Sequence, residues 1–160
     1  MVFCTPVTPS LPLKRDLDIV LLVRSILHRL GAGRLDTFKE RLRNQKIQYF
    51  AQVFRVSPMY EFNLYIHGPY SPDLTRDLFG TQEYSIAQTS FVALEAEARF
   101  NRLKAFVAGK APRDLELLAT YHWLKNIARV GNPSSSLRTI KGATAQELEY
   151  CKAQLQQVSL

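Results

Sequence analysis

Several features that define particular protein classes are missing from this sequence of 160 residues. Its two cysteines, Cys4 and Cys151, lie near opposite ends of the chain, which fits neither a disulfide framework nor the spacing of a metal site. We expect both to be reduced thiols, and Cys151 to be a small buried hydrophobe in a helix. The best apolar run, DIVLLVRSILHRL, is interrupted by Arg24, His28 and Arg29, so it falls short of the roughly 18 to 20 apolar residues that span a bilayer.

The sequence also shows no secretory leader. The segment MVFCTPVTPSLP has neither a basic n-region nor a continuous apolar stretch, which predicts a cytoplasmic protein. With 46% hydrophobic and 22% charged residues, the chain has the composition of one soluble globular domain. We therefore expect a proline-rich arm over residues 1–13 and a single domain over 14–160, without an internal repeat.

No recognisable catalytic arrangement is present. His28, His67 and His122 stand far apart, without a Cys, Asp or Glu at the spacing of metal ligands. The sequence has no G-x-S-x-G, Walker loop, H-E-x-x-H or glycine-rich dinucleotide turn. We therefore predict a protein that is not an enzyme and that uses neither a metal nor another cofactor. We expect His122 to be a core histidine with one hydrogen bond and Trp123 to be a packed indole.

What the sequence does contain is an uneven distribution of charge. Lys and Arg outnumber Asp and Glu by 10 to 4 in residues 1–60 and by 8 to 2 in 101–141, whereas acidic residues prevail by 6 to 2 in 61–100. If folding brings the two basic segments together, the resulting positive face attracts nucleic acid or an acidic protein partner. If folding scatters them, they are solvated helix faces that keep the protein soluble.

Two helices and a strand are predicted in the first half of the chain. Apolar residues recur at helical spacing over 14–30, and Gly31 suits the left-handed cap that ends such a helix. A second helix is expected over 35–55, with a basic first half and aromatic residues at its end. Residues 61–67 alternate between apolar and polar side chains, as in a strand with two unlike faces.

The pentapeptide GPYSP at 68–72 is predicted to turn this strand into a helix. Gly68 and Pro69 are expected to end the strand, Ser71 to cap the helix and Pro72 to occupy its first position. A helix start can bind an anion, but one glycine and two prolines leave few backbone donors for a phosphate loop. The pattern therefore favours a capped corner.

The second half of the chain is predicted to be mainly helical. Residues 84–88 are expected to form a second short strand that pairs with the first, and GNPSSS at 131–136 is expected to be a connection. Thr144 and Glu147 have the spacing of a capping box ahead of a last helix. Further helices are expected over 90–109, 113–130 and 137–142.

Three stretches together carry a family resemblance: QKIQYFAQ at 45–52, FNLYIHGPYSPDL at 62–74 and LELLAT at 115–120. They are similar to the signature of the YwgA-like proteins and the related SocA-like, or Panacea, antitoxin domain. In those families a helix ending K-L-x-Y-x-x-Q precedes a strand, a G-P-Y-S-P-x-L corner and a later L-E-L-L-A-S helix. The tail KGATAQELEYCKAQL resembles the family's ending, so the resemblance covers about residues 35–157.

This resemblance implies both a fold and a role. The fold is a compact, mostly α-helical α+β domain with a small two- or three-stranded antiparallel sheet. The role is binding, because the antitoxin relatives hold a partner toxin and no catalytic residues come with the family. Residues 1–30 depart from the family pattern and are a dimer element, a partner-binding helix or a second part of the core.

The first functional hypothesis is therefore an antitoxin-like or adaptor-like module that binds a partner protein and neutralises or presents it. Its candidate contacts are Tyr65 and His67, on the strand face opposite the apolar row, and Tyr70 at the corner. Exposed tyrosines are favoured anchors in interfaces. The alternative is that these side chains are covered by a neighbouring helix or by the N-terminal arm.

The second hypothesis is a winged-helix-like regulator that binds DNA or RNA through its basic helix faces. Arg34, Lys39, Arg41, Arg43 and Lys46 would then contact phosphates, and binding would weaken steeply with salt. Against this hypothesis, the aromatic end of the helix suits a supporting element better than an exposed recognition helix. The sequence names no partner and leaves open whether the protein is a homodimer.

Overall fold

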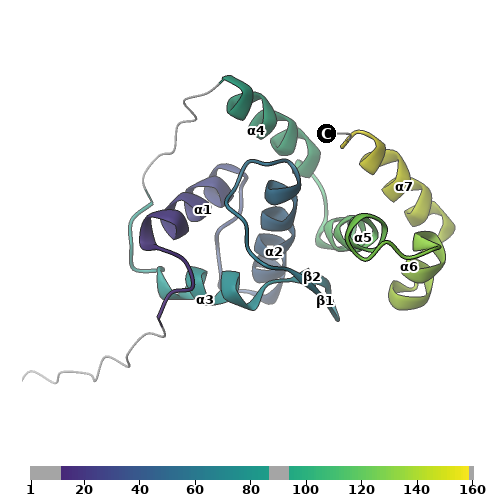
Figure 1. Ribbon diagram of the computed structural model, residues 1–160, viewed down its shortest axis with the longest axis horizontal. Helices are drawn as coiled ribbons and strands as arrows, with labels where there is room; N and C mark the ends of the chain where they lie inside the picture. The colour runs from purple at the N-terminus through teal and green to yellow at the C-terminus, as the bar shows by residue number, and fades with distance from the viewer. Residues whose placement is uncertain (1–11, 87–93, 159–160) are drawn as a thin grey trace, which may run out of the picture.

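The computed structural model describes residues 12–86 and 94–158 of the chain. It confirms a mostly helical α+β fold, in which β1 and β2 form a two-stranded antiparallel sheet (Figure 1). No helix of these two segments combines the length and the apolar character needed to cross a bilayer. Cys4 and nearly all of the expected proline-rich arm lie outside the described residues. In chain order the elements are α1 (Leu17–Arg29), α2 (Phe38–Val53), β1 (Asn63–Tyr65), β2 (Gly68–Tyr70), α3 (Pro72–Gly80), α4 (Leu94–Val107), α5 (Pro112–His122), the π-helical turn η1 (Trp123–Ile127), α6 (Pro133–Lys141) and α7 (Ala145–Gln156).

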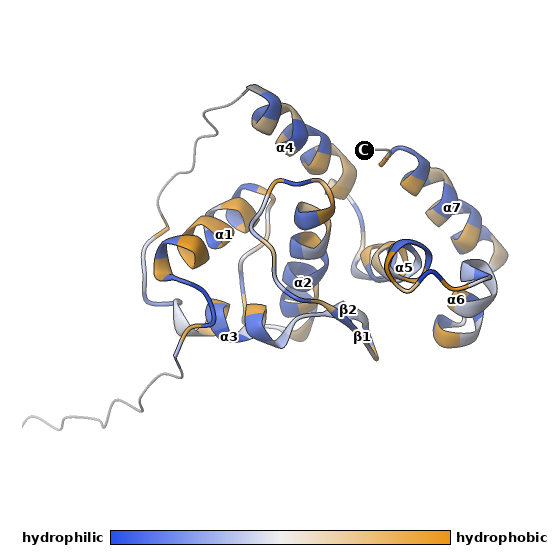
Figure 2. Cartoon of the chain, in the orientation of Figure 1, coloured by the Kyte–Doolittle hydropathy of each residue, from blue (hydrophilic) through white to orange (hydrophobic). Residues whose placement is uncertain are grey.

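Helices α2 and α5 form the centre of the fold. Helix α2 packs against α1, α3, α4 and α5, and α5 also packs against α6 and α7. In Figure 1, α1 and α3 lie on one side of α2, and α5, α6 and α7 lie on the other. The helices in Figure 2 carry both hydrophobic and hydrophilic residues, as amphipathic helices around one core do. The core includes Ile47, Phe50, Phe100, Leu115 and Leu118, each exposed by 2% or less.

Helix α1 belongs to the core. It begins and ends within the expected 14–30, buries Val23 and Ile26, and packs against α2 and α3. Gly31 follows with φ +75°, the left-handed conformation that the sequence predicted there. Of the roles left open for the N-terminal region, this helix therefore supplies a second part of the core.

Helix α2 begins later than the expected residue 35, because Thr37 and Glu40 form a capping box that was not predicted. The Thr37 hydroxyl accepts from the Glu40 N–H, and the Glu40 carboxylate accepts from the Thr37 N–H. Residues 44–51 are all buried, so the polar Gln45 and Lys46 enter the interior. The hypothesis that Lys46 contacts phosphates required this lysine to be exposed, whereas it is 1% exposed.

The predicted strand is shorter than expected, and its partner is a different segment. Of residues 61–67, only the middle three form β1, because Ile66 and His67 make a two-residue turn. The expectation that Gly68 and Pro69 end the strand is therefore wrong, since both belong to β2. The positive φ of Gly68, +86°, lets the chain reverse here. The register pairs Asn63 with Tyr70, Leu64 with Pro69 and Tyr65 with Gly68.

The rest of the pentapeptide is as predicted. Ser71 caps α3 by accepting from the Leu74 N–H at 3.3 Å, and Pro72 is the first residue of the helix. The strand expected over 84–88 is not found at 84–86, and 87–88 lie outside the described residues.

The helices of the second half are present with changed boundaries. The helix expected over 90–109 is described from residue 94 as α4, and Gly109 follows it with φ +69°. The helix expected over 113–130 is divided, because α5 gives way to η1 after His122.

The connection predicted at 131–136 is partly wrong. Pro133 starts α6, and the Asn132 side chain caps it by accepting from the Ser135 N–H, so the serines lie in the first turns of a helix. The capping box of Thr144 and Glu147 at the start of α7 is confirmed.

Candidate functional site

The hairpin is built around Gly68, where neither the backbone nor the surroundings accept a side chain. Its φ lies in the left-handed region that favours glycine. A Cβ at this position would lie 2.5 Å from the Thr120 Oγ1 and 3.3 Å from the Lys46 Nζ. The absence of a side chain thus lets β2 approach α2 and α5 at once, and β2 contacts both helices.

Lys46 connects β2 to α2. Pro69 has no N–H, and its carbonyl oxygen accepts from the Lys46 Nζ at 2.5 Å. The lysine is 1% exposed, and desolvation lowers its pKa to about 7, although the Glu116 carboxylate acts in the opposite direction. The hairpin is therefore attached through an amine whose charged form is disfavoured.

Gln45 fixes the end of β2 with its side-chain amide. The amide oxygen accepts from the Ser71 N–H at 2.8 Å, and the amide nitrogen donates to the Ser71 carbonyl at 3.0 Å. The same nitrogen donates to the Thr75 hydroxyl at 2.8 Å, which lies 2.7 Å from the Tyr70 hydroxyl. Gln45 thus bonds Ser71 as a neighbouring strand would.

A buried ion pair holds the turn of the hairpin. The Glu116 carboxylate lies 2.5 Å from the Lys141 Nζ, and both side chains are nearly buried. Lys141 also donates to the Ile66 carbonyl, and the His67 Nδ1 lies 4.0 Å from the same carboxylate. The pair connects the turn to α5 and α6, and the loss of one partner would leave the other charge buried and unpaired.

A hollow of about 410 Å³ lies between the hairpin, the first half of α2 and helix α3. Its rim carries large apolar side chains in water: Phe38 is 52% exposed, Tyr65 48%, Ile66 85% and Phe79 44%. Exposed apolar side chains that gather in one place mark an interaction site more often than scattered ones do. We call this feature the aromatic hollow; its lining residues are Phe38, Arg41, Leu42, Gln45, Lys46, Tyr65, Ile66, His67, Tyr70, Thr75 and Phe79.

The structure brings the three predicted partner contacts together, since Tyr65, His67 and Tyr70 all line the aromatic hollow. The rings of Tyr65 and Tyr70 meet edge to face with centroids 5.5 Å apart, and those of Phe38 and His67 with centroids 5.0 Å apart. Tyr65 and His67 are exposed, and Tyr70 is half-buried.

Two rim residues, Phe38 and Phe79, were not predicted as contacts. Phe38 is the first residue of α2 and Phe79 lies in the last turn of α3, where an apolar side chain extends beyond the packed part of the helix. In the sequence, the only feature that points to Phe38 and Phe79 as contacts is that each is an aromatic residue near the end of a helix. Their proximity to the hairpin depends on how α2 and α3 pack.

The predicted phosphate contacts do not form one set. Arg34 lies 3.3 Å from the Asp36 carboxylate and is also near Glu40, and Arg41 donates to the Leu35 carbonyl at 2.9 Å. Arg43 donates to the Lys110 carbonyl at 3.5 Å, Lys39 is exposed, and Lys46 is enclosed beneath the hairpin. A phosphate contact by Lys46 would require its amine to leave Pro69.

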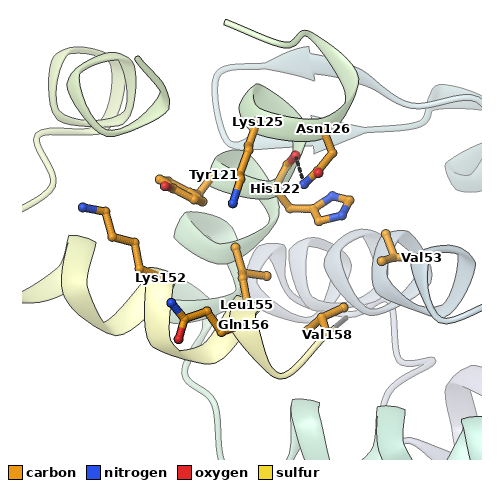
Figure 3. A pocket seen from close by; sticks show the side chains of 9 residues that line it. All are labelled: Val53, Tyr121, His122, Lys125, Asn126, Lys152, Leu155, Gln156 and Val158. Carbon is orange, nitrogen blue, oxygen red and sulfur yellow. Dashed lines mark hydrogen bonds between the residues drawn. The ribbon is translucent and has the colours of Figure 1, made fainter. Parts of the chain in front are cut away.

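Outside the hairpin, a cavity of about 590 Å³ lies beside α5, η1 and α7, as Figure 3 shows. Its wall includes His122, whose Nδ1 lies 2.7 Å from the Tyr49 hydroxyl, as expected for a histidine with one hydrogen bond. Burial, with a smaller effect of Lys125, lowers the His122 pKa to about 4, so the ring is neutral near pH 7. Burial also raises the pKa of Tyr49, so its hydroxyl keeps its proton, and it is the donor to Nδ1 in the tautomer that carries the ring proton on Nε2.

Within residues 12–86 and 94–158, no three His, Cys, Asp or Glu side chains converge as a metal site. Cys151 is a buried free thiol, and burial raises its pKa to about 12, which disfavours the reactive thiolate. The aromatic hollow, by contrast, gathers exposed aromatic side chains from α2, the hairpin and α3.

No family model matches the chain, and no curated protein or solved structure matches it either. The resemblance to the YwgA-like and SocA-like proteins therefore stays a prediction. The residues that carry it, in particular Gln45, Lys46 and Gly68, are the ones that fix the hairpin corner.

Proposed function

We propose that this protein is a non-catalytic protein-binding module of antitoxin or adaptor type, which holds a partner protein at the aromatic hollow and so neutralises or presents it. The observation that supports the proposal is the exposure of Phe38, Tyr65, Ile66 and Phe79 around one hollow. Aromatic side chains are enriched at the centres of protein interfaces, where they supply most of the binding energy. The proposal places the protein in the cytoplasm, where a free buried thiol such as Cys151 stays reduced.

The backbone around the hollow is fixed before any partner arrives. Gln45 bonds both main-chain groups of Ser71, and Lys46 bonds the carbonyl of Pro69. A surface that is already ordered loses little conformational entropy on association, which favours binding. The hairpin therefore offers its exposed side chains from a rigid support.

The experiment is co-purification of the tagged full-length chain with the proteins encoded beside its gene. Tyr65→Ala and Phe79→Ala each remove a rim aromatic. Tyr84→Ala is the matched control, because Tyr84 is 49% exposed, against 48% for Tyr65, and does not line the hollow. We expect stoichiometric capture by the wild type and by Tyr84→Ala, and weaker capture by both rim variants, with thermal unfolding showing that all of them are folded.

Equal capture by the rim variants and by the control would overturn the proposal. The same co-purification also tests the nucleic-acid alternative. A DNA- or RNA-binding regulator would retain nucleic-acid duplexes, and the retained amount would fall as the salt concentration rises. Retention that is reduced in Lys39→Ala and unchanged in Tyr65→Ala would favour that alternative.

A further inference from the structure

The two strands of the hairpin have different surroundings. Strand β2 is the inner strand, because it contacts α2 and α5 and because Gln45 occupies the main-chain groups of Ser71 at its end. Strand β1 is the outer strand, and its Asn63 and Tyr65 are exposed. An outer strand with free main-chain groups is a site where another extended segment can pair.

Pro69 determines which main-chain groups of β1 face outward. In an antiparallel pair, opposed residues alternate between those that exchange two hydrogen bonds and those that exchange none. Pro69 has no N–H, and its carbonyl is bonded to Lys46 on α2, so Leu64 and Pro69 are a pair without mutual hydrogen bonds. The N–H and C=O of Leu64 therefore point away from β2. Neither group has a hydrogen-bond partner within residues 12–86 and 94–158.

The side chains beside this edge lead into the aromatic hollow. Tyr65 and Tyr70 lie on one face of the hairpin with their rings in contact, and both line the hollow. A third strand on β1 would continue this face, because neighbouring strands lie about 4.8 Å apart with their side chains in register. Every second side chain of the added segment would then lie beside Tyr65.

The charge of the hollow indicates the chemistry of that segment. Arg41 and Lys46 line the hollow, but Lys46 is 1% exposed and bonded to Pro69, so Arg41 supplies the accessible positive charge. No Asp or Glu is among the described lining residues. An acidic segment complements this lining. A second copy of the chain would instead bring two such basic linings together, in a protein whose net charge is +7. A partner with acidic residues is therefore favoured over self-association.

We propose that an extended, acidic segment of the partner protein adds to β1 as a third strand, bonds the main chain of Leu64 and places an apolar side chain beside Tyr65 in the aromatic hollow. This inference rests on the proposed function and specifies how the partner is held. Leu64 is the only residue of β1 whose N–H and C=O both point outward, so the backbone bonds are few and mainly set the direction of the added segment. The side chain in the hollow provides most of the affinity.

Random dodecapeptides displayed on phage and selected against the full-length chain are the probe. We expect the enriched peptides to be acidic and to alternate apolar with polar residues. Their binding should fall in Tyr65→Ala but not in Tyr84→Ala. Leu64→Pro removes the outward N–H without removing a bond of the hairpin, so it should weaken peptide binding about tenfold. Leu64→Val keeps the N–H and is the matched control.

Amide hydrogen exchange on the wild-type chain gives a second readout that does not depend on the folding of Leu64→Pro. We expect the Leu64 amide to exchange freely in the isolated protein and to become protected when a selected peptide is added. If peptides bind at Tyr65 but Leu64 stays unprotected and Leu64→Pro binds like Leu64→Val, strand addition is wrong and the proposed function stands. If no peptide is enriched, or if Tyr65→Ala binds the peptides unchanged, strand addition at the hollow is wrong, whereas the proposed function fails only if the rim variants also capture a partner as well as the control does. Protection of Leu64 in a dimer of the chain alone would assign the edge to self-association and overturn the inference.

Discussion

The amine of Lys46 donates a hydrogen bond to the carbonyl oxygen of Pro69, which is 2.5 Å away, and the lysine is only 1% exposed. Pro69 can offer only this carbonyl to α2, and a long side chain is needed to reach it. The contact satisfies a buried acceptor, but it also takes an ammonium group out of water. The attachment of the hairpin is thus coupled to the protonation of one amine.

The free energy of unfolding is expected to rise with pH between about 7 and 10.5, the folded and ordinary pKa values of Lys46. Between them the unfolded chain binds more protons than the folded chain, so alkaline pH favours the folded state. Below about pH 7 both states hold this proton, and the full cost of burying the charge applies. Urea unfolding from pH 6 to pH 10 measures the effect, which we expect to be on the order of a few kcal/mol. In Lys46→Met the increase of the unfolding free energy with pH that is due to this amine should be lost. Identical dependences of the unfolding free energy on pH in the two proteins would contradict the prediction.

Gly68→Ala is expected to destabilise the protein by about 2 to 4 kcal/mol, through strain at positive φ and through overpacking. The added Cβ would lie 2.5 Å from the Thr120 Oγ1. Gly109→Ala is the matched control, because Gly109 also has a positive φ, +69°, but no atom of the described residues lies within 4 Å of its Cβ position. The control should lose only about 1 to 2 kcal/mol. Equal losses in urea unfolding would show that the contact with Thr120 has no effect.

The helices were predictable from the sequence because their signals are local. Helix α7, for example, is defined by the capping box of Thr144 and Glu147 and by the apolar residues that follow it. Strand β2 was not predictable in this way. Its pairing requires Gly68, which is packed against side chains of α2 and α5. The carbonyl of Pro69 finds its hydrogen-bond donor in Lys46, which lies 23 residues away in the sequence.

The candidate site was predictable only where it lies on one continuous stretch of the sequence. Tyr65 and His67 were identified from the alternation of residues 61–67 and Tyr70 from the corner that follows, and all three line the aromatic hollow. Phe38 and Phe79 join them from α2 and α3, and no local pattern encodes that contact. The burial of Lys46 was missed for a related reason: the sequence gives its charge, but only the packing of α2 among its neighbours removes it from water.

Gln45→Ala is expected to cost about 1 to 3 kcal/mol, because it leaves the buried N–H of Ser71 without its acceptor, while the Ser71 C=O keeps the Thr75 N–H as a donor. The amide of Ser71 should also exchange with solvent faster, since its acceptor is removed. Gln146→Ala on the exposed first turn of α7 is the control and should stay within about 0.5 kcal/mol of the wild type. A small loss in Gln45→Ala with unchanged exchange at Ser71 would show that other groups hold the end of β2.

His122 is expected to stay neutral well below its ordinary pKa of 6.5, because burial, with a smaller effect of Lys125, lowers this pKa to about 4. Between about pH 4 and 6.5 the unfolded chain binds more protons, so this group lowers stability as the pH falls through that window. The Tyr49 hydroxyl lies 2.7 Å from Nδ1 and is the donor in the tautomer that carries the ring proton on Nε2. In that tautomer Tyr49→Phe removes the donor and keeps the ring, so it should raise the His122 pKa and cost about 1 kcal/mol. Nuclear magnetic resonance titration of the imidazole measures both proteins. A wild-type midpoint at the ordinary pKa, or one that Tyr49→Phe leaves unchanged, would mean that the hydroxyl does not stabilise the neutral ring beside the cavity.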